Sequence, residues 1–214
     1  VNTSIFEQLQ SGDVLIHQPY ESFDGVLAFL REAVRDKHVL AIKQTIYRTG
    51  ADSELMELLR EAVQRGKEVT VIVELKARFD EEAYINWAEK LEYIGAQVVY
   101  GVVGLKTHAK MLLVSRREGR LIRRYAHLST GNYNPKTAKL YTDISHLTSD
   151  AKITQDVETV FNLLANQSKI PRLNKLMLAP FHLQKNQVRL CLANSFYKNV
   201  PKVTIRFRNL RNSK

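Results

Sequence analysis

The stretch VLAIKQTIYRTGADSELMELLREAVQRGKEVTVIVEL, residues 39–75, decides the fold class. Residues 39–47 form an apolar, β-branched run that predicts a buried strand. Residues 53–66 have the amphipathic period of a helix that ends at Gly66, and residues 68–75 predict a second buried strand. A strand, a helix and a strand in this order predict a βαβ unit with two parallel strands.

The pattern continues on both sides of this stretch. Downstream, a helix over 80–95 and a strand over 96–101 predict a second βαβ unit, and a further helix is predicted upstream over 22–36. After Gly104 the periodicity changes. Two strands joined by a Glu-Gly turn, another short strand and a capped helix are predicted over 110–117, 121–129, 142–149 and 150–167. We therefore expect an α/β fold whose mixed sheet contains βαβ units and is flanked by helices.

Composition excludes several classes of protein. The chain has 214 residues, of which 44% are hydrophobic and 25% charged, so it is neither disordered nor fibrous. No apolar run is long enough to span a bilayer, and no secretory signal opens the chain. The single cysteine, Cys191, excludes a Cys-based zinc site and fits a reducing compartment. We expect a cytoplasmic protein, with peripheral membrane association left open, and the absent initiator Met predicts that the chain begins inside a longer protein.

The net charge of +10 is unevenly distributed. Residues 185–214 hold eight Lys and Arg and no acid, whereas residues 1–184 hold 24 basic and 22 acidic residues. We therefore divide the chain into a domain, 1–184, and a basic tail, 185–214, in which residues 203–210 have the pattern of a strand. A nearly neutral domain does not predict a specific nucleic-acid binder, so a polyanion site in it must use a few placed cations.

The segment GLKTHAKMLLV, residues 104–114, carries the main chemical signal. His108 and Lys110 are two residues apart at the start of an apolar run, and such residues point to the same face of a strand. A nucleophilic nitrogen beside a fixed cation suits attack on phosphorus. A surface histidine beside a lysine would have the same spacing, so this pair alone leaves both interpretations open.

Two further groups of residues favour a phosphate site. In HLSTGNYNPKTAKLYTD, residues 127–143, Gly131 and Asn134 belong to a predicted tight loop that opens into a short helix, where backbone N–H groups bind phosphate. Arg48 and Arg78 each follow a predicted parallel strand, and ligands of open α/β sheets bind beyond the carboxyl ends of strands. Each loop or arginine taken singly also fits a polar turn or a surface ion pair.

The motifs HQPYESFDGVLAFL, LAIKQTIYRTG, VELKARFDEE, GLKTHAK and STGNYNPKTAKLYTD together resemble the type 1 polyphosphate kinases. The resemblance covers the first C-terminal catalytic domain, which is related to the phospholipase D fold. It implies reversible transfer of the terminal phosphate of ATP to inorganic polyphosphate through a phosphohistidine at His108. It also implies that Tyr141 contacts ATP, that Lys110 and Asn134 clamp phosphoryl groups, and that the cofactor is Mg²⁺.

The same resemblance associates Arg48 and Arg78 with magnesium. A guanidinium cannot ligate a cation, so we expect both arginines to hold phosphate oxygens that in turn hold Mg²⁺. The implied partners are ATP, ADP and polyphosphate, and a homo-oligomer like that of the family remains open.

Two alternatives compete with a polyphosphate kinase. The phospholipase D pattern requires an aspartate where this chain has Ser115, which argues against a phosphodiesterase or nuclease. Full-length family members are several times longer, and a following domain supplies a second histidine. Residues beyond 184 do not resemble the family, and His182 matches no catalytic position. The second alternative is therefore an inactive fragment that binds nucleotide or polyphosphate.

Overall fold

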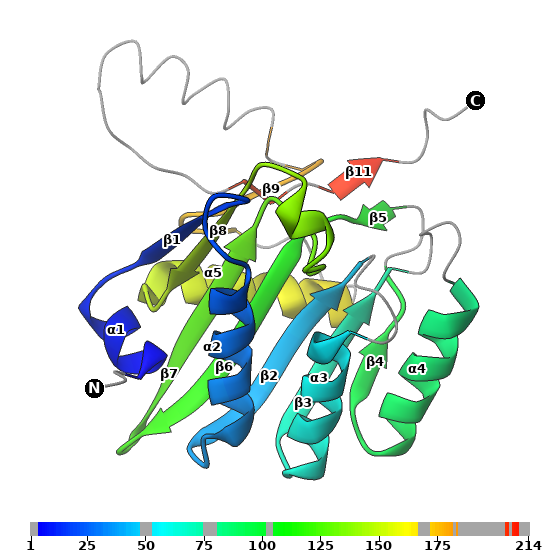
Figure 1. Cartoon of the computed structure of the whole chain (residues 1–214), viewed down its shortest axis with the longest axis horizontal. Coiled ribbons are helices and arrows are strands. Elements are labelled where there is room, and N and C mark those ends of the chain that lie inside the picture. The colour runs from blue at the N-terminus through cyan, green and yellow to red at the C-terminus, as the bar shows by residue number, and fades with distance from the viewer. Residues whose placement is uncertain are drawn as a thin grey trace.

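The computed structural model describes residues 4–47, 53–74, 81–101, 105–166, 172–181, 183, 204–205 and 207–209. Within this part of the chain, seven strands form one sheet in the order β1-β8-β7-β6-β2-β3-β4 (Figure 1). The strands are β1 (Val14–Gln18), β2 (Val39–Ile46), β3 (Glu68–Val73), β4 (Gln97–Val99), β6 (Lys110–Glu118), β7 (Leu121–Ser129) and β8 (Asp143–Thr148). β2, β3 and β4 are parallel, whereas β6, β7, β8 and β1 pair antiparallel. The predicted mixed sheet is confirmed.

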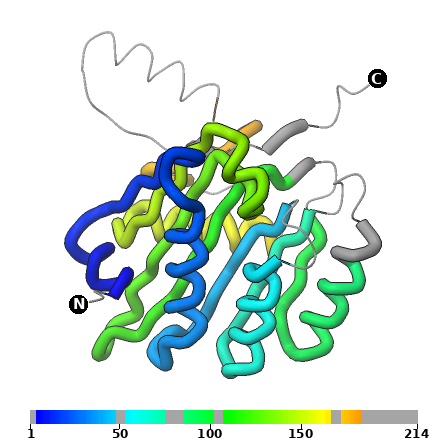
Figure 2. Tube along the Cα trace, viewed as in Figure 1, coloured from blue at the N-terminus to red at the C-terminus, as the bar shows by residue number. Residues whose placement is uncertain are grey.

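Helices cover both faces of the sheet. Figure 1 shows α2 (Asp24–Arg35), α3 (Glu54–Gln64) and α4 (Glu81–Tyr93) in front of it and α5 (Ala151–Asn166) behind it, with α1 (Ile5–Ser11) near the N-terminus. The trace in Figure 2 follows the alternation of strand and helix from β2 to β4. None of the helices in the described part of the chain is long and apolar enough to cross a membrane.

The central strand β6 is buried on both faces because its apolar side chains alternate between two cores. Leu112 and Val114 belong to the larger core, together with side chains from α1 to α4. Met111 and Leu113 belong to the core that α5 completes with Val157, Val160, Phe161 and Leu164. This two-sided burial explains why the sequence of β6 reads as one continuous apolar run.

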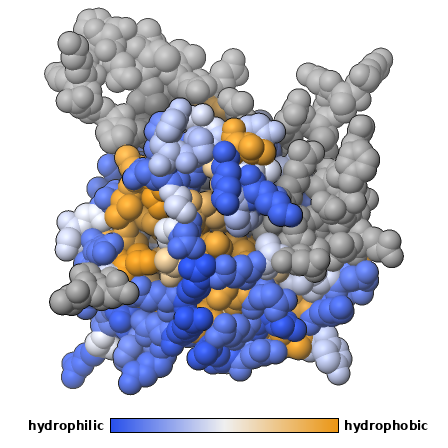
Figure 3. Space-filling view, in the orientation of Figure 1, coloured by the Kyte–Doolittle hydropathy of each residue, from blue (hydrophilic) through white to orange (hydrophobic). Residues whose placement is uncertain are grey.

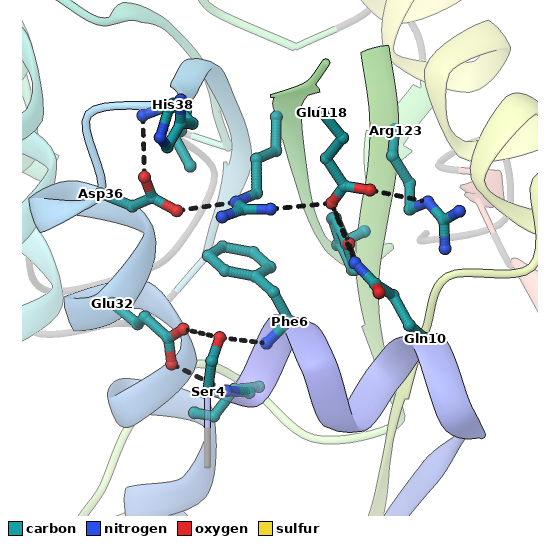
Figure 4. A network of polar contacts seen from close by, with 12 residues as sticks. Ser4, Phe6, Gln10, Glu32, Asp36, His38, Glu118 and Arg123 are labelled. Carbon is teal, nitrogen blue, oxygen red and sulfur yellow. Dashed lines mark hydrogen bonds and ion pairs between the residues drawn. The ribbon is translucent and has the colours of Figure 1, made fainter. Parts of the chain in front are cut away.

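A polar network around Arg116 lies near the turn between β6 and β7. Figure 4 shows the network with Asp36, Glu118 and Arg123 labelled. Arg116 Nε donates to Asp36 Oδ2 at 2.7 Å and Nη1 donates to Glu118 Oε1 at 3.0 Å. Glu118 also accepts from Gln10 Nε2 at 3.2 Å and pairs with Arg123 at 3.1 Å. The network joins α1, the end of α2 and the β6–β7 hairpin. The lower part of the visible face is mainly hydrophilic, with smaller hydrophobic patches (Figure 3).

The last described segments add two short pairs of strands. β9 (Met177–Leu178) pairs with β10 (Thr204–Ile205), and β5 (Leu105–Thr107) pairs with β11 (Phe207–Asn209). Parts of the predicted strand over 203–210 therefore form β10 and β11. The division of the chain at residue 185 stays a prediction.

Candidate active site

Four strand ends lie at the upper edge of the sheet in Figure 1, and the described site residues His108, Lys110 and Asn134 lie on or beside them. β2 and β3 end at this edge, and β6 begins there because it runs antiparallel to β2. Lys110, the first residue of β6, pairs with Ser129, the last residue of β7. The segment before β6, with His108, and the loop after β7, with Asn134, consequently leave the sheet at neighbouring positions.

The side chains of His108 and Lys110 lie together, as their spacing predicts. Lys110 Nζ is 2.9 Å from His108 Nδ1 and 3.1 Å from Nε2, and it donates to the His108 carbonyl oxygen at 2.7 Å. Because Nζ is nearly equidistant from both ring nitrogens, it does not point along the lone pair of either one. Lys110 is 5% exposed and His108 is half-buried, so the imidazole remains accessible while the ammonium is fixed beside it.

Tyr47, which directly follows β2, lies beside both His108 and Lys110. Its ring centroid lies 5.6 Å from that of His108 and 5.4 Å from Lys110 Nζ. A buried aromatic face beside an ammonium contributes cation–π attraction and restricts the ammonium to one position. The sequence analysis included Tyr47 in a strand and assigned it no role at the site.

The loop after β7 is shaped by the close approach of Gly131 to Asp143. A Cβ atom at Gly131 would lie 2.4 Å from Asp143 Oδ2 and 2.6 Å from Asp143 Cγ. Asp143 Oδ1 accepts a hydrogen bond from Thr130 Oγ1 at 2.7 Å, and Thr130 Oγ1 accepts one from Ile144 N at 3.0 Å. A side chain at position 131 would therefore require Asp143 to shift.

Asn134 lies three residues before the short 3₁₀ helix η1 (Thr137–Lys139), whose N-cap residue is Lys136. Its Oδ1 accepts from Lys136 N at 3.0 Å and from Thr137 N at 3.3 Å. The amide oxygen thus satisfies helical N–H groups, and the Nδ2 group is the donor with which this side chain can hold a phosphoryl oxygen. Tyr141 lies just beyond η1 and is 63% exposed, so its ring is accessible to a nucleotide.

A buried pair lies beneath this loop. His127, on β7, has its Nδ1 2.7 Å from Tyr133 Oη, and both residues are almost completely buried. Burial, reinforced by His146, lowers the pKa of His127 to about 3, so its ring is neutral at physiological pH. The contact fixes the loop from below, and the sequence analysis did not identify it.

Part of the predicted site belongs to segments that the structure does not describe. Arg48 and Arg78 lie outside the described residues, as does His182. The predicted site residues Lys110, His108 and Asn134 offer an ammonium, an imidazole and an amide, and the ammonium and the amide N–H groups suit phosphate oxygens. Among the described residues, no three His, Cys, Asp or Glu side chains are grouped as metal ligands.

A cavity of about 510 Å³ opens at the opposite edge of the sheet. It is lined by Gln10, His38, Arg116, Arg117, Glu118 and Gly119, and none of the predicted site residues lines it.

Comparison with known proteins identifies the family. Residues 4–170 match the family model described as polyphosphate kinase C-terminal domain 1. The chain belongs to the polyphosphate kinase family. The polyphosphate kinase of Burkholderia multivorans is 56% identical over 185 residues, which are 85% of this chain and 27% of that relative. The polyphosphate kinase of Paraburkholderia phytofirmans is 52% identical over 198 residues, 91% of this chain and 29% of that relative. The chain therefore spans little more than a quarter of the length of these relatives.

Solved structures agree with the fold. The polyphosphate kinase of Porphyromonas gingivalis superposes with a TM-score of 0.79 at 36% identity, over 90% of this chain and 33% of that one. Nuc of Salmonella typhimurium, a phospholipase D family member, superposes with a TM-score of 0.56 at 14% identity, over 75% of this chain and 98% of that one. NucT of Helicobacter pylori gives 0.57 at 13%, over 72% of this chain and 95% of that one. The two latter proteins share the fold alone, and the predicted phospholipase D-like architecture is confirmed.

Proposed function

We propose that this chain forms the phosphohistidine-bearing half of a polyphosphate kinase site, which transfers the terminal phosphate of ATP reversibly to inorganic polyphosphate. The contact between His108 and Lys110 carries the proposal. The imidazole is accessible, and the ammonium lies 2.9 and 3.1 Å from its two nitrogens, where it can neutralise a phosphoryl group that approaches the ring.

The reaction has two steps. A neutral nitrogen of His108 attacks the γ-phosphorus of ATP, the bond to the β,γ-bridging oxygen breaks, and ADP leaves. A terminal oxygen of polyphosphate then attacks the phosphohistidine, the N–P bond breaks, and the polyphosphate is longer by one unit. Lys110 neutralises charge on the transferred phosphoryl group throughout, and Asn134 holds one of its oxygens.

Other groups complete the substrate site in this proposal. Tyr141 offers its exposed ring to the adenine of ATP, and Arg48 and Arg78 bind phosphate oxygens. Mg²⁺ would be held through the phosphate oxygens of the substrate that Lys110, Arg48 and Arg78 bind, and it would neutralise part of their charge. The groups that approach the γ-phosphate from the opposite side come from outside this chain, so we expect the 214 residues alone to bind ATP or polyphosphate and to turn over slowly. A cytoplasmic location is part of the same proposal.

The test is a chimera in which this chain replaces the matching segment of the Burkholderia multivorans relative. Incubation with γ-labelled ATP should give protein-bound label that is labile in acid and stable in base, and His108→Ala should abolish it. Label that persists in the His108→Ala chimera would remove His108 as the nucleophile. Rapid turnover by the isolated 214 residues would show that the second half of the site is dispensable.

A further inference from the structure

A buried carboxylate, which the sequence analysis did not single out, lies directly behind the segment that carries His108. Glu74 follows the last residue of β3, is 5% exposed, and donates its backbone N–H to Ile46 O at 3.1 Å. Its Oε2 accepts the backbone N–H of Thr107 at 2.7 Å. Thr107 is the last residue of β5 and immediately precedes His108.

The chain packs closely around this carboxylate. Gly101 has a positive φ of 57°, and a Cβ atom there would lie 3.8 Å from Glu74 Oε2 and 4.0 Å from Thr107 Oγ1. The ends of β3 and β5 and the turn after β4 therefore meet at one carboxylate. Burying a carboxylate is unfavourable unless it accepts hydrogen bonds, and a charge-assisted bond of 2.7 Å is a strong one.

The main chain on the other side of His108 is held in a similar way. Thr45 Oγ1, on β2, donates to Ala109 O at 2.8 Å and accepts from Met111 N at 3.0 Å. Lys110 Nζ donates to the carbonyl oxygen of His108 itself at 2.7 Å. Thr45 on β2 and Glu74 just after β3 thus fix the residues before and after the histidine, although His108 lies outside a regular strand.

We propose that Glu74 is a positioning residue for phosphoryl transfer, which holds the main chain of Thr107 so that the His108 imidazole meets the γ-phosphorus in line. The proposal rests on the function proposed above. In-line attack requires a near-attack geometry, and a displacement of about 1 Å can reduce a rate about 100-fold. This role requires an acceptor oxygen for the Thr107 N–H group, which an amide oxygen at the same position also supplies.

Three variants of the chimera test this inference, and each is measured for the rate of phosphohistidine formation, for kcat and for the KM of ATP. Glu74→Ala removes the acceptor and should lower kcat roughly 100-fold with an unchanged KM. Glu74→Gln keeps an acceptor oxygen at the same distance from the main chain and should retain a rate within about tenfold of the parent.

Asp156→Asn is the matched control, because Asp156 is a buried carboxylate that also accepts backbone N–H groups. Its donors are Asn174, Lys175 and Leu176. It should lower thermal stability and leave kcat unchanged.

The outcomes separate the two proposals. A parental kcat in folded Glu74→Ala, or a fall of kcat and a rise of KM together, would overturn the positioning role. Equal losses in Glu74→Gln and Glu74→Ala would overturn it in favour of a role for the charge. Should Glu74→Ala not fold, Glu74→Gln decides by itself, because a rate more than tenfold below the parent contradicts the inference. If the parent chimera forms no phosphohistidine, the proposed function fails and takes this inference with it.

Discussion

Asp156 gives the sharpest test of how the C-terminal part of the domain is held. The carboxylate is 1% exposed on α5, and it accepts the backbone N–H groups of Asn174, Lys175 and Leu176 at 2.9, 2.6 and 2.9 Å. Asn174 Nδ2 adds a fourth contact at 2.9 Å. One side chain therefore fixes the segment that leads into β9. Asp156→Ala should detach this segment from α5.

The size of the loss follows from the exposure of the donors. Leu176 is buried, so its orphaned N–H costs about 1–3 kcal/mol. Asn174 and Lys175 are exposed, so water can replace the carboxylate, and each lost bond costs nearer 0.5–1 kcal/mol. We expect the free energy of unfolding to fall by about 3 kcal/mol in total, and by roughly half of that in Asp156→Asn, which keeps one acceptor oxygen.

The assay is urea denaturation followed by circular dichroism. Lys152→Ala, at an exposed position of the same helix, serves as the control and should change the free energy of unfolding by less than about 0.5 kcal/mol. A loss below about 1 kcal/mol in Asp156→Ala would refute the reasoning, because it would mean that the N–H groups find other partners at little cost.

Three further predictions follow from the site. The pKa of His127, about 3 when folded, lies below its unfolded value, so the stability it supports is present above pH ~6.5 and lost at up to ~1.4 kcal/mol per unit as the pH falls toward 3. Denaturation at several pH values should show this slope, and His127→Gln should flatten it. Gly131→Ala should displace Asp143 and reduce phosphohistidine formation by tenfold or more in rapid-quench experiments. Tyr141→Ala should weaken ATP binding about tenfold in calorimetric titration and leave polyphosphate binding unchanged, and equal losses would contradict that division.

The long elements could be predicted from sequence because their burial patterns are local. The expected strand over 39–47 is β2 (Val39–Ile46), and the expected helix over 150–167 is α5 (Ala151–Asn166). The short elements α1, β1, β5 and β9 were not predicted. A strand such as β5, Leu105–Thr107, has too few residues to show a period, and its pairing with β11 depends on contacts distant in sequence.

At the site, too, contacts between neighbouring residues could be predicted, whereas contacts between distant residues could not. The proximity of His108 and Lys110 was expected from the two-residue period of a strand, and the two side chains do lie together although His108 is in the link between β5 and β6. Glu74 escaped notice because its partner Thr107 is 33 residues away. The hydrogen bond from Thr130 Oγ1 to the Asp143 carboxylate likewise joins residues of two different strand ends. That loop geometry depends on how β7 and β8 pair.

The contact between Gly131 and Asp143 also constrains how this sequence can change over time. With only 2.4 Å between a new Cβ atom and Asp143 Oδ2, any side chain at 131 collides with the carboxylate, and shortening Asp143 alone removes the acceptor for Thr130. Each single change is expected to be harmful, but glycine at 143 removes the three side-chain atoms that a Cβ atom at 131 would meet first. The two positions should therefore show epistasis, with a double substitution less harmful than the sum of its parts. Sequence drift at this loop would then proceed by paired changes, and the order in which they occur would decide whether a functional protein survives in between.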